Sequence, residues 1–178
     1  RIAGLKGPTS IGLVKVMKDN ADGKAVTVTP ETANLVSRAL TYCKKSGGVF
    51  DITAGCLTRL WDFHRKVSPE KQALQQAVRH VNWHCVNVFQ ENEHWYVQLA
   101  NPEAALDMGG IAKGWVADEL GKHLYQAGFE NFLINLGGNV LAHGRNAKGE
   151  PWAIGITNPF PQQNEKVIVH CTDESVVT

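Results

Sequence analysis

The sequence predicts an α+β fold, in which a mixed or antiparallel sheet is flanked by helices. One observation behind this prediction is the order of apolar patterns along the chain: helix, helix, hairpin, helix and then several short strands. The other is that strands and helices do not alternate regularly, as they would in a doubly wound nucleotide-binding fold. We therefore expect an α+β or mixed-sheet domain.

The first expected helix covers residues 29–47. Thr29 can serve as its N-cap, and Pro30 suits the first helical position. Gly47 lies where a left-handed C-cap residue belongs, so the helix should end there. The side chains expected to face the core are Val36, Leu40 and Cys43.

The remaining elements follow from the same signals. A second helix is expected from Ser68, as its cap, through Val78. Alternating apolar residues predict a hairpin over residues 85–100, and helical spacing returns over residues 111–127, with Gly128 as C-cap. The apolar face of that third helix would be Val116, Leu120 and Leu124. Short strands are expected at residues 132–136, 140–142, 152–157 and 167–171.

Composition narrows the class of protein. With 178 residues, 43% hydrophobic and 20% charged, the chain has the balance of a globular protein, which excludes disordered, collagen-like and coiled-coil proteins. A net charge of +1 excludes a general attraction to nucleic acid or to an anionic membrane, so a charged ligand needs a local site. The four cysteines form no C-x-x-C pair, which argues against structural zinc and a dense disulfide framework. We expect them to be small buried side chains.

The strongest local motif covers residues 106–114. It combines the carboxylate of Asp107, the doublet Gly109-Gly110 and the ammonium group of Lys113 at the start of a helix. Free N–H groups at a helix start and a lysine can hold phosphate oxygens, while glycine carbonyls can ligate a hard cation. The alternative is a tight strand-to-helix turn, since the string is not a P-loop.

Two further strings have ordinary structural explanations when taken alone. Residues 47–53, followed by Leu60-Trp61-Asp62-Phe63, fit an Asx-type turn or the cap of a following helix. Residues 135–139, Asn-Leu-Gly-Gly-Asn, fit a bend between two strands.

Together, and followed by Pro-Trp-Ala-Ile-Gly-Ile at residues 151–156, these strings resemble the ApbE family of FAD:protein FMN transferases. The family pattern reads G-x-F-D-x-T-x-G-x-L, L-W-x-F, D-x-G-G-I-A-K-G-Y, N-x-G-G-D and P-W-x-I-G-I. It covers the chain from about Val28 to its end. The resemblance implies an ApbE-like domain with a T-fold-like core over residues 21–178. It does not assign residues 1–20.

The resemblance also implies a function. Such enzymes use FAD and Mg2+ to transfer FMN to a threonine hydroxyl of a target flavoprotein and release AMP, and some hydrolyse FAD to FMN and AMP. By position in the motifs, the FAD contacts would be Val49, Phe50, Asp51, Asp107 and Lys113. The carbonyl of Gly110 would ligate magnesium, while the resemblance names no catalytic side chain in this chain. The partners would be FAD and the flavoprotein, not nucleic acid.

The chain departs from the family pattern at several positions. Trp115 replaces the usual Tyr and Asn139 the usual Asp, while Cys56 and Thr58 alter the string after Asp51. The family's other magnesium ligands and an H-x-I-D-P string follow a Ser-x-x-[ST]-S-G segment, within which this chain stops at residues 175–178. The seven histidines do not supply that string. We therefore expect a fragment truncated at the carboxyl end.

Several alternatives stay open from the sequence. The chain could be an FAD-binding module or an FAD pyrophosphatase without protein transferase activity. Residues 6–14 also resemble a ligand loop of extracytoplasmic solute-binding proteins, although a loop leading into a short apolar helix explains them as well. A solute-binding or structural domain is therefore the third hypothesis. The resemblance implies a periplasmic or extracytoplasmic location, with membrane anchoring only through a lipid absent from this chain, and a cytoplasmic location as the alternative.

Overall fold

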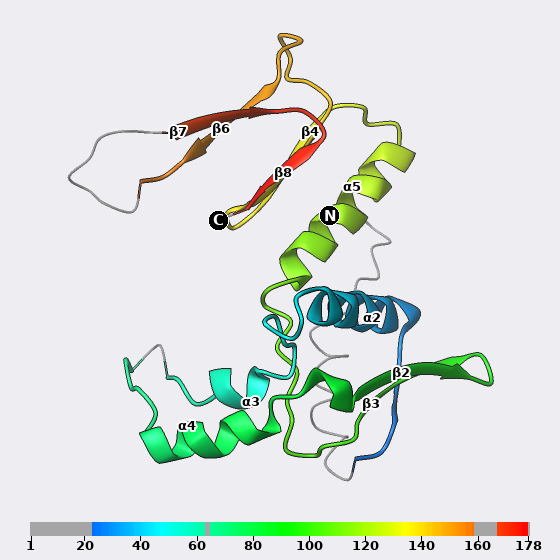
Figure 1. The fold of residues 1–178 in the computed structure, drawn as a ribbon. Coiled ribbons are helices and arrows are strands. Elements are labelled where there is room, and N and C mark those ends of the chain that lie inside the picture. The colour runs from blue at the N-terminus through cyan, green and yellow to red at the C-terminus, as the bar shows by residue number, and fades with distance from the viewer. Residues whose placement is uncertain (1–22, 63–64, 159–166, 178) are drawn as a thin grey trace. The chain divides into compact units, whose positions relative to one another are not determined.

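The computed structural model describes residues 23–62, 65–158 and 167–177 (Figure 1). The segment 1–20, Phe63 and Thr178, all considered above, lie outside the described residues. The chain divides into two compact units, Arg1–Gly110 and Ile111–Thr178. Each unit is described by itself below.

The first unit combines a small antiparallel sheet with helices. Its strands β1 (Val26–Val28), β2 (Val86–Glu91) and β3 (His94–Leu99) pair in the order β1-β3-β2. Helix α2 (Pro30–Lys45) packs on β2 and β3, as Figure 1 shows. Its shorter helices are α3 (Gly55–Thr58), α4 (Lys71–Ala77), and the 3-10 turns η2 (Val78–His80) and η3 (Trp83–Cys85). The largest fully buried side chains of this unit include Leu35, Val36, Ile52, Val97 and Leu99.

Helix α2 confirms the capping signals read from the sequence. Thr29 is its N-cap and accepts a hydrogen bond from the Thr32 N–H. At the other end, Gly47 has a φ of +64° and its N–H donates to Lys44, while the Gly48 N–H donates to the Cys43 carbonyl. This is a Schellman motif, which satisfies the last helical carbonyls and turns the chain sharply. Of the three predicted core residues, Val36 and Cys43 are buried and Leu40 is half-buried.

The second predicted helix begins later than expected. Helix α4 starts at Lys71 and its N-cap is Glu70, which makes no side-chain capping hydrogen bond. Ser68 is therefore not the cap. The reason is that Val67 pairs with Asp62 through two backbone hydrogen bonds, which hold the chain extended just before Ser68.

The hairpin is confirmed, with Asn92 and Glu93 both at positive φ in its two-residue turn. The strand β1 was not predicted, since three residues are too short to produce a periodic signal. It depends on its pairing with β3.

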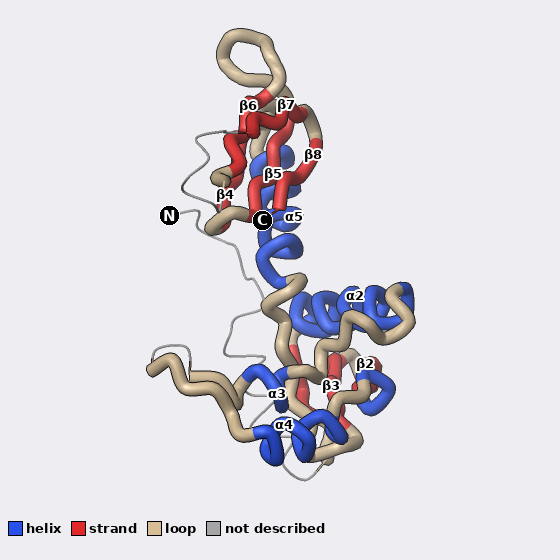
Figure 2. Tube along the Cα trace, turned by 60° about the vertical axis from the view of Figure 1, so that its left-hand side comes forward, coloured by secondary structure: helices blue, strands red, loops and turns tan. Residues whose placement is uncertain are grey.

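The second unit places a helix on a three-stranded sheet. Helix α5 (Ala112–Gln126) contacts β4 (Phe132–Leu136) and β5 (Asn139–His143), and the strands pair in the order β4-β5-β8, with β8 at Glu174–Val177 (Figure 2). Strands β6 (Trp152–Ile156) and β7 (Val167–Cys171) form a separate antiparallel pair. The four predicted strands of this unit are confirmed to within one residue at each end, while β8 was not predicted.

The end of α5 was predicted correctly, but its buried face was not. Gly128 has a φ of +88° and, with Phe129, closes a second Schellman motif. Val116, Leu120 and Leu124 are only half-buried, and the buried residues are Trp115, Ala117 and Gly121. A methyl group on Gly121 would lie 2.9 Å from Leu141 Cδ2. The helix therefore packs closely on the sheet at a glycine, which apolar periodicity does not reveal.

The predicted fold class is confirmed. Helices flank sheets in both units, and every pair of named strands in the described residues is antiparallel. Within the same residues, no helix has the length and apolar character needed to cross a membrane.

Replacing Gly47 with Ala should lower the free energy of unfolding by about 1 kcal/mol, because a Cβ at positive φ is strained. The described residues place no atom within 4 Å of the added methyl, so backbone strain is the main effect. Urea unfolding followed by circular dichroism measures it. Ser37→Ala, at an exposed position of the same helix, is the control and should not lower the midpoint. Equal midpoints for both variants would contradict the Schellman assignment.

Candidate functional site

The loop after α2 presents an apolar side chain to solvent. Val49 is 93% exposed, although it follows directly on the Schellman motif. The Ser46 hydroxyl fastens this loop: it accepts the Phe50 N–H at 3.0 Å and donates to the Cys43 carbonyl at 3.0 Å. A fastened loop that exposes a valine loses little conformational entropy when a ligand covers that side chain.

The carboxylate of Asp51 organises the chain around it. Its Oδ1 accepts the Thr53 N–H at 2.8 Å and the Thr53 hydroxyl at 2.6 Å, and its Oδ2 accepts the Trp83 N–H at 3.0 Å. The Thr53 hydroxyl in turn accepts the Asn82 N–H at 2.8 Å. These hydrogen bonds join the loop at Asp51 to the turn before β2. Thr53, whose hydroxyl takes part in two of the contacts, is fully buried.

The second carboxylate, Asp107, lies on a neighbouring segment. Its backbone N–H donates to the Ile52 carbonyl at 2.7 Å, which places it beside the Asp51 loop. Its Oδ1 accepts the Gly109 N–H at 2.8 Å, and its Oδ2 accepts the Thr58 hydroxyl at 2.8 Å. Asp107 is half-buried, so part of the carboxylate faces solvent.

A glycine allows these two segments to meet. A methyl group on Gly55 would lie 2.5 Å from the Ala105 carbonyl oxygen and 2.9 Å from the Leu106 carbonyl carbon. Just beside this contact, Ala54 and Ala105 form a parallel bridge. The close approach therefore needs glycine, and it fixes residues 51–58 against residues 104–107.

The structure brings most of the predicted site residues together. A methyl on Gly110 would lie 3.0 Å from Phe50 Cε2, so the predicted metal ligand lies against a predicted FAD contact. Val49, Phe50, Asp51, Asp107 and Gly110 thus all belong to two adjoining loops of the first unit. Lys113 is an exposed residue in the first turn of α5, in the second unit.

The chemistry of the donors can be tested against magnesium. The carbonyl oxygen of Gly110 and the carboxylate of Asp107 are hard oxygen donors of the type that Mg2+ prefers. Among residues 23–62, 65–158 and 167–177, no group of three or more His, Cys, Asp or Glu side chains is placed to hold a metal ion. The donor type of these two residues therefore fits Mg2+.

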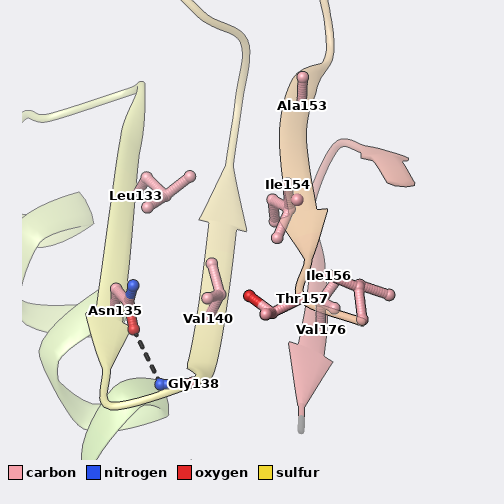
Figure 3. A pocket seen from close by; sticks show the side chains of 10 residues that line it. Leu133, Asn135, Gly138, Val140, Ala153, Ile154, Ile156, Thr157 and Val176 are labelled. Atoms are coloured by element: carbon pink, nitrogen blue, oxygen red, sulfur yellow. Dashed lines mark hydrogen bonds between the residues drawn. The ribbon is translucent and has the colours of Figure 1, made fainter. Parts of the chain in front are cut away.

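The strings at residues 135–139 and 151–156 line one pocket in the second unit. Figure 3 shows Asn135, Gly138 and Val140 on one side of it, with Ile154 and Thr157 on the other. Its volume is about 440 Å³. The Gly138 N–H donates to Asn135 Oδ1 at 3.1 Å, which holds the turn between β4 and β5 at the rim. The two motifs therefore form one concave surface, although they are separate in sequence.

The cysteines are free thiols, as expected, and three of the four are buried. Burial raises the pKa of the Cys43 thiol and of the Cys56 thiol. A protonated thiol is a poorer nucleophile than a thiolate, and both side chains pack in the core as small apolar residues.

Sequence reasoning missed three contributors to the site. Ser46, Thr58 and Trp83 each hydrogen bond to a predicted residue or its neighbour, through a hydroxyl or a backbone N–H. The Ser46 contact is local and could have been found as a side-chain cap after a helix. The Thr58 and Trp83 contacts join residues 49 and 32 positions apart, and local patterns carry no signal for them.

Thr53→Val should lower the free energy of unfolding by about 2 kcal/mol, because the fully buried Thr53 hydroxyl is lost and the Asn82 N–H is left without its acceptor. Thr53→Ser keeps the hydroxyl and removes one methyl, so it should cost about 1 kcal/mol. Urea unfolding of both variants measures the difference. A serine variant as unstable as the valine variant would contradict the hydroxyl network.

Comparison with known proteins identifies the family that the chain matches. Residues 12–178 match the model of the ApbE family. The match begins within residues 1–20, the segment that the sequence left unassigned. The chain is 34% identical over 158 residues to the FAD:protein FMN transferase of Treponema pallidum, covering 81% of this chain and 44% of that protein. It is 27% identical over 148 residues to the enzyme of that name from Klebsiella pneumoniae, covering 81% and 42%. The chain thus spans less than half the length of these curated relatives.

Solved structures of ApbE proteins have a fold similar to that of this chain. The flavin transferase ApbE from Vibrio cholerae matches with a TM-score of 0.77 at 26% identity, over 90% of this chain and 53% of that one. The ApbE protein from Thermotoga maritima matches with a TM-score of 0.72 at 26% identity, over 87% and 52%. These likenesses confirm the ApbE-like fold. Because the family model matches nearly the whole chain, the chain belongs to the ApbE family.

Proposed function

We propose that this chain is part of an Mg2+-dependent FAD:protein FMN transferase that modifies a threonine of a target flavoprotein. The observation that carries the proposal is the surface made by Val49, Phe50 and Gly110 beside the Asp107 carboxylate. A nearly fully exposed valine on a fastened loop offers an apolar contact to a flavin-nucleotide ligand. The names of the relatives support the choice of FAD over other nucleotides.

The proposed reaction is a phosphoryl transfer. The threonine oxygen attacks the FMN phosphorus of FAD, and the bond from that phosphorus to the bridging oxygen of the pyrophosphate breaks. The hydroxyl proton passes to solvent, AMP leaves with the bridging oxygen, and a phosphoester joins FMN to the threonine. Such a reaction depends mainly on positioning and on neutralising phosphate charge.

The residues of this chain divide these tasks. Lys113, with its ammonium group in the first turn of α5, would neutralise part of the pyrophosphate charge. The Asp51 carboxylate already accepts three hydrogen bonds from the chain, so its proposed role is to hold the Val49–Phe50 loop in place. Asp107 would accept hydrogen bonds from donor groups of FAD. When bound through the Gly110 carbonyl, Mg2+ would supply further charge neutralisation.

Incubation of the full-length natural protein with FAD, Mg2+ and a threonine-bearing flavoprotein should yield AMP and covalently bound FMN in equal amounts. Mass spectrometry of the acceptor and chromatography of the nucleotides measure both products. AMP without protein-bound flavin would indicate the alternative, an FAD pyrophosphatase. FAD bound without AMP release would indicate a flavin-binding module.

Lys113→Ala should weaken FAD binding about tenfold, because a charge-assisted hydrogen bond to phosphate is lost. Lys122→Ala is the matched control, since Lys122 is also exposed on α5 and pairs only weakly with Glu119 at the surface. It should change the affinity less than about twofold. Flavin fluorescence titration compares the three proteins. Equal affinities for Lys113→Ala and the unmodified protein would remove Lys113 from the site.

A further inference from the structure

The Asp107 carboxylate is held from two sides. The Gly109 N–H donates to Oδ1 and the Thr58 hydroxyl donates to Oδ2, each at 2.8 Å. One donor on each oxygen fixes both the position of the carboxylate and the orientation of its plane. Further lone pairs on both oxygens can accept hydrogen bonds from a ligand.

The Thr58 hydrogen bond depends on how the backbone is placed. Thr58 is the last residue of α3, and α3 begins at Gly55, where the chain touches the Ala105 carbonyl. The Asp107 N–H bond to Ile52 fixes the other segment at the same place. Two backbone contacts thus bring the hydroxyl to the carboxylate across 49 positions of sequence.

This hydrogen bond has little to contribute to folding stability. It lies at the surface, and Thr58 itself is exposed. Water can replace either partner, so the net gain in folding free energy is small. The main effect of a hydroxyl that orients a partly exposed carboxylate is therefore on the affinity of that carboxylate for a ligand.

We propose that Thr58 is a positioning residue, which orients the Asp107 carboxylate to accept a hydrogen bond from FAD. This inference rests on the proposed function, since only there does Asp107 contact FAD. Like charges repel, so the oriented carboxylate would receive a donor group of FAD and not its pyrophosphate.

The first test compares Thr58→Val with Thr58→Ser in the full-length natural protein. Valine has the shape of threonine without the hydroxyl, and serine retains the hydroxyl. Thr58→Val should raise the Kd and KM for FAD about fivefold, with kcat changed less than about twofold, because the lost contact is equally strong in ground and transition states. Thr58→Ser should restore the KM to within about twofold of the unmodified protein. The melting temperature should change by less than about 2 °C in both.

The second test asks whether Thr58 acts through Asp107. In an Asp107→Ala background, adding Thr58→Val should produce no further increase in the Kd for FAD, because the group it orients is gone. Thr41→Val is the matched control, since that exposed hydroxyl donates to the Ser37 backbone carbonyl of its own helix. It should leave the Kd for FAD unchanged.

The outcomes separate the two proposals. If the unmodified protein binds FAD and Thr58→Val binds it equally well, the positioning role is overturned while the proposed function stands. The same conclusion follows if the effects of Asp107→Ala and Thr58→Val simply add. If the unmodified protein does not bind FAD, the proposed function fails, and the positioning role fails with it.

Discussion

The contact at Gly55 is the constraint on which the first unit's site depends. A side chain there would overlap the Ala105 carbonyl, so only glycine lets residues 51–58 lie against residues 104–107. The backbone hydrogen bond from Asp107 to Ile52 and the Thr58–Asp107 pair both require that proximity. Without it the two loops that carry the predicted FAD contacts would be separate surface loops.

Local signals predicted the parts of the fold that local chemistry determines. The cap at Thr29 and the positive-φ turn at Gly47 involve neighbouring residues, so the sequence contains everything needed to recognise them. The predictions were wrong where contacts between separate segments determine the local structure. The pairing of Val67 with Asp62 delays α4, and β1 exists only because β3 lies beside it. Apolar periodicity likewise missed Gly121, because a glycine contact adds no hydrophobic residue to the pattern.

In the candidate site, too, local patterns predicted some features and missed others. Its motifs predicted six residues, of which five lie on adjoining loops of the first unit and Lys113 lies in the second. The motifs did not predict what holds these residues. Ser46, Thr53 and Thr58 each use a hydroxyl to fasten a loop or a carboxylate, and two of these contacts reach a predicted acid. Hydroxyl side chains fit many environments, so their partners become evident only from the fold.

The carboxylates of Asp51 and Asp107 are held by the same kinds of hydrogen bond in different surroundings. Each carboxylate accepts a threonine hydroxyl and backbone N–H groups, but Thr53 is fully buried whereas Thr58 is exposed. The network at Asp51 is part-buried around a fully buried Thr53, so losing a partner there costs more and its hydrogen bonds help to maintain the loop. The exposed pair at Asp107 gains little stability, and the half-buried carboxylate keeps further lone pairs that can accept hydrogen bonds. Burial of the threonine therefore distinguishes the two acids: the network at Asp51 joins segments of the fold, and Asp107 is the acid to which the proposal above assigns a ligand.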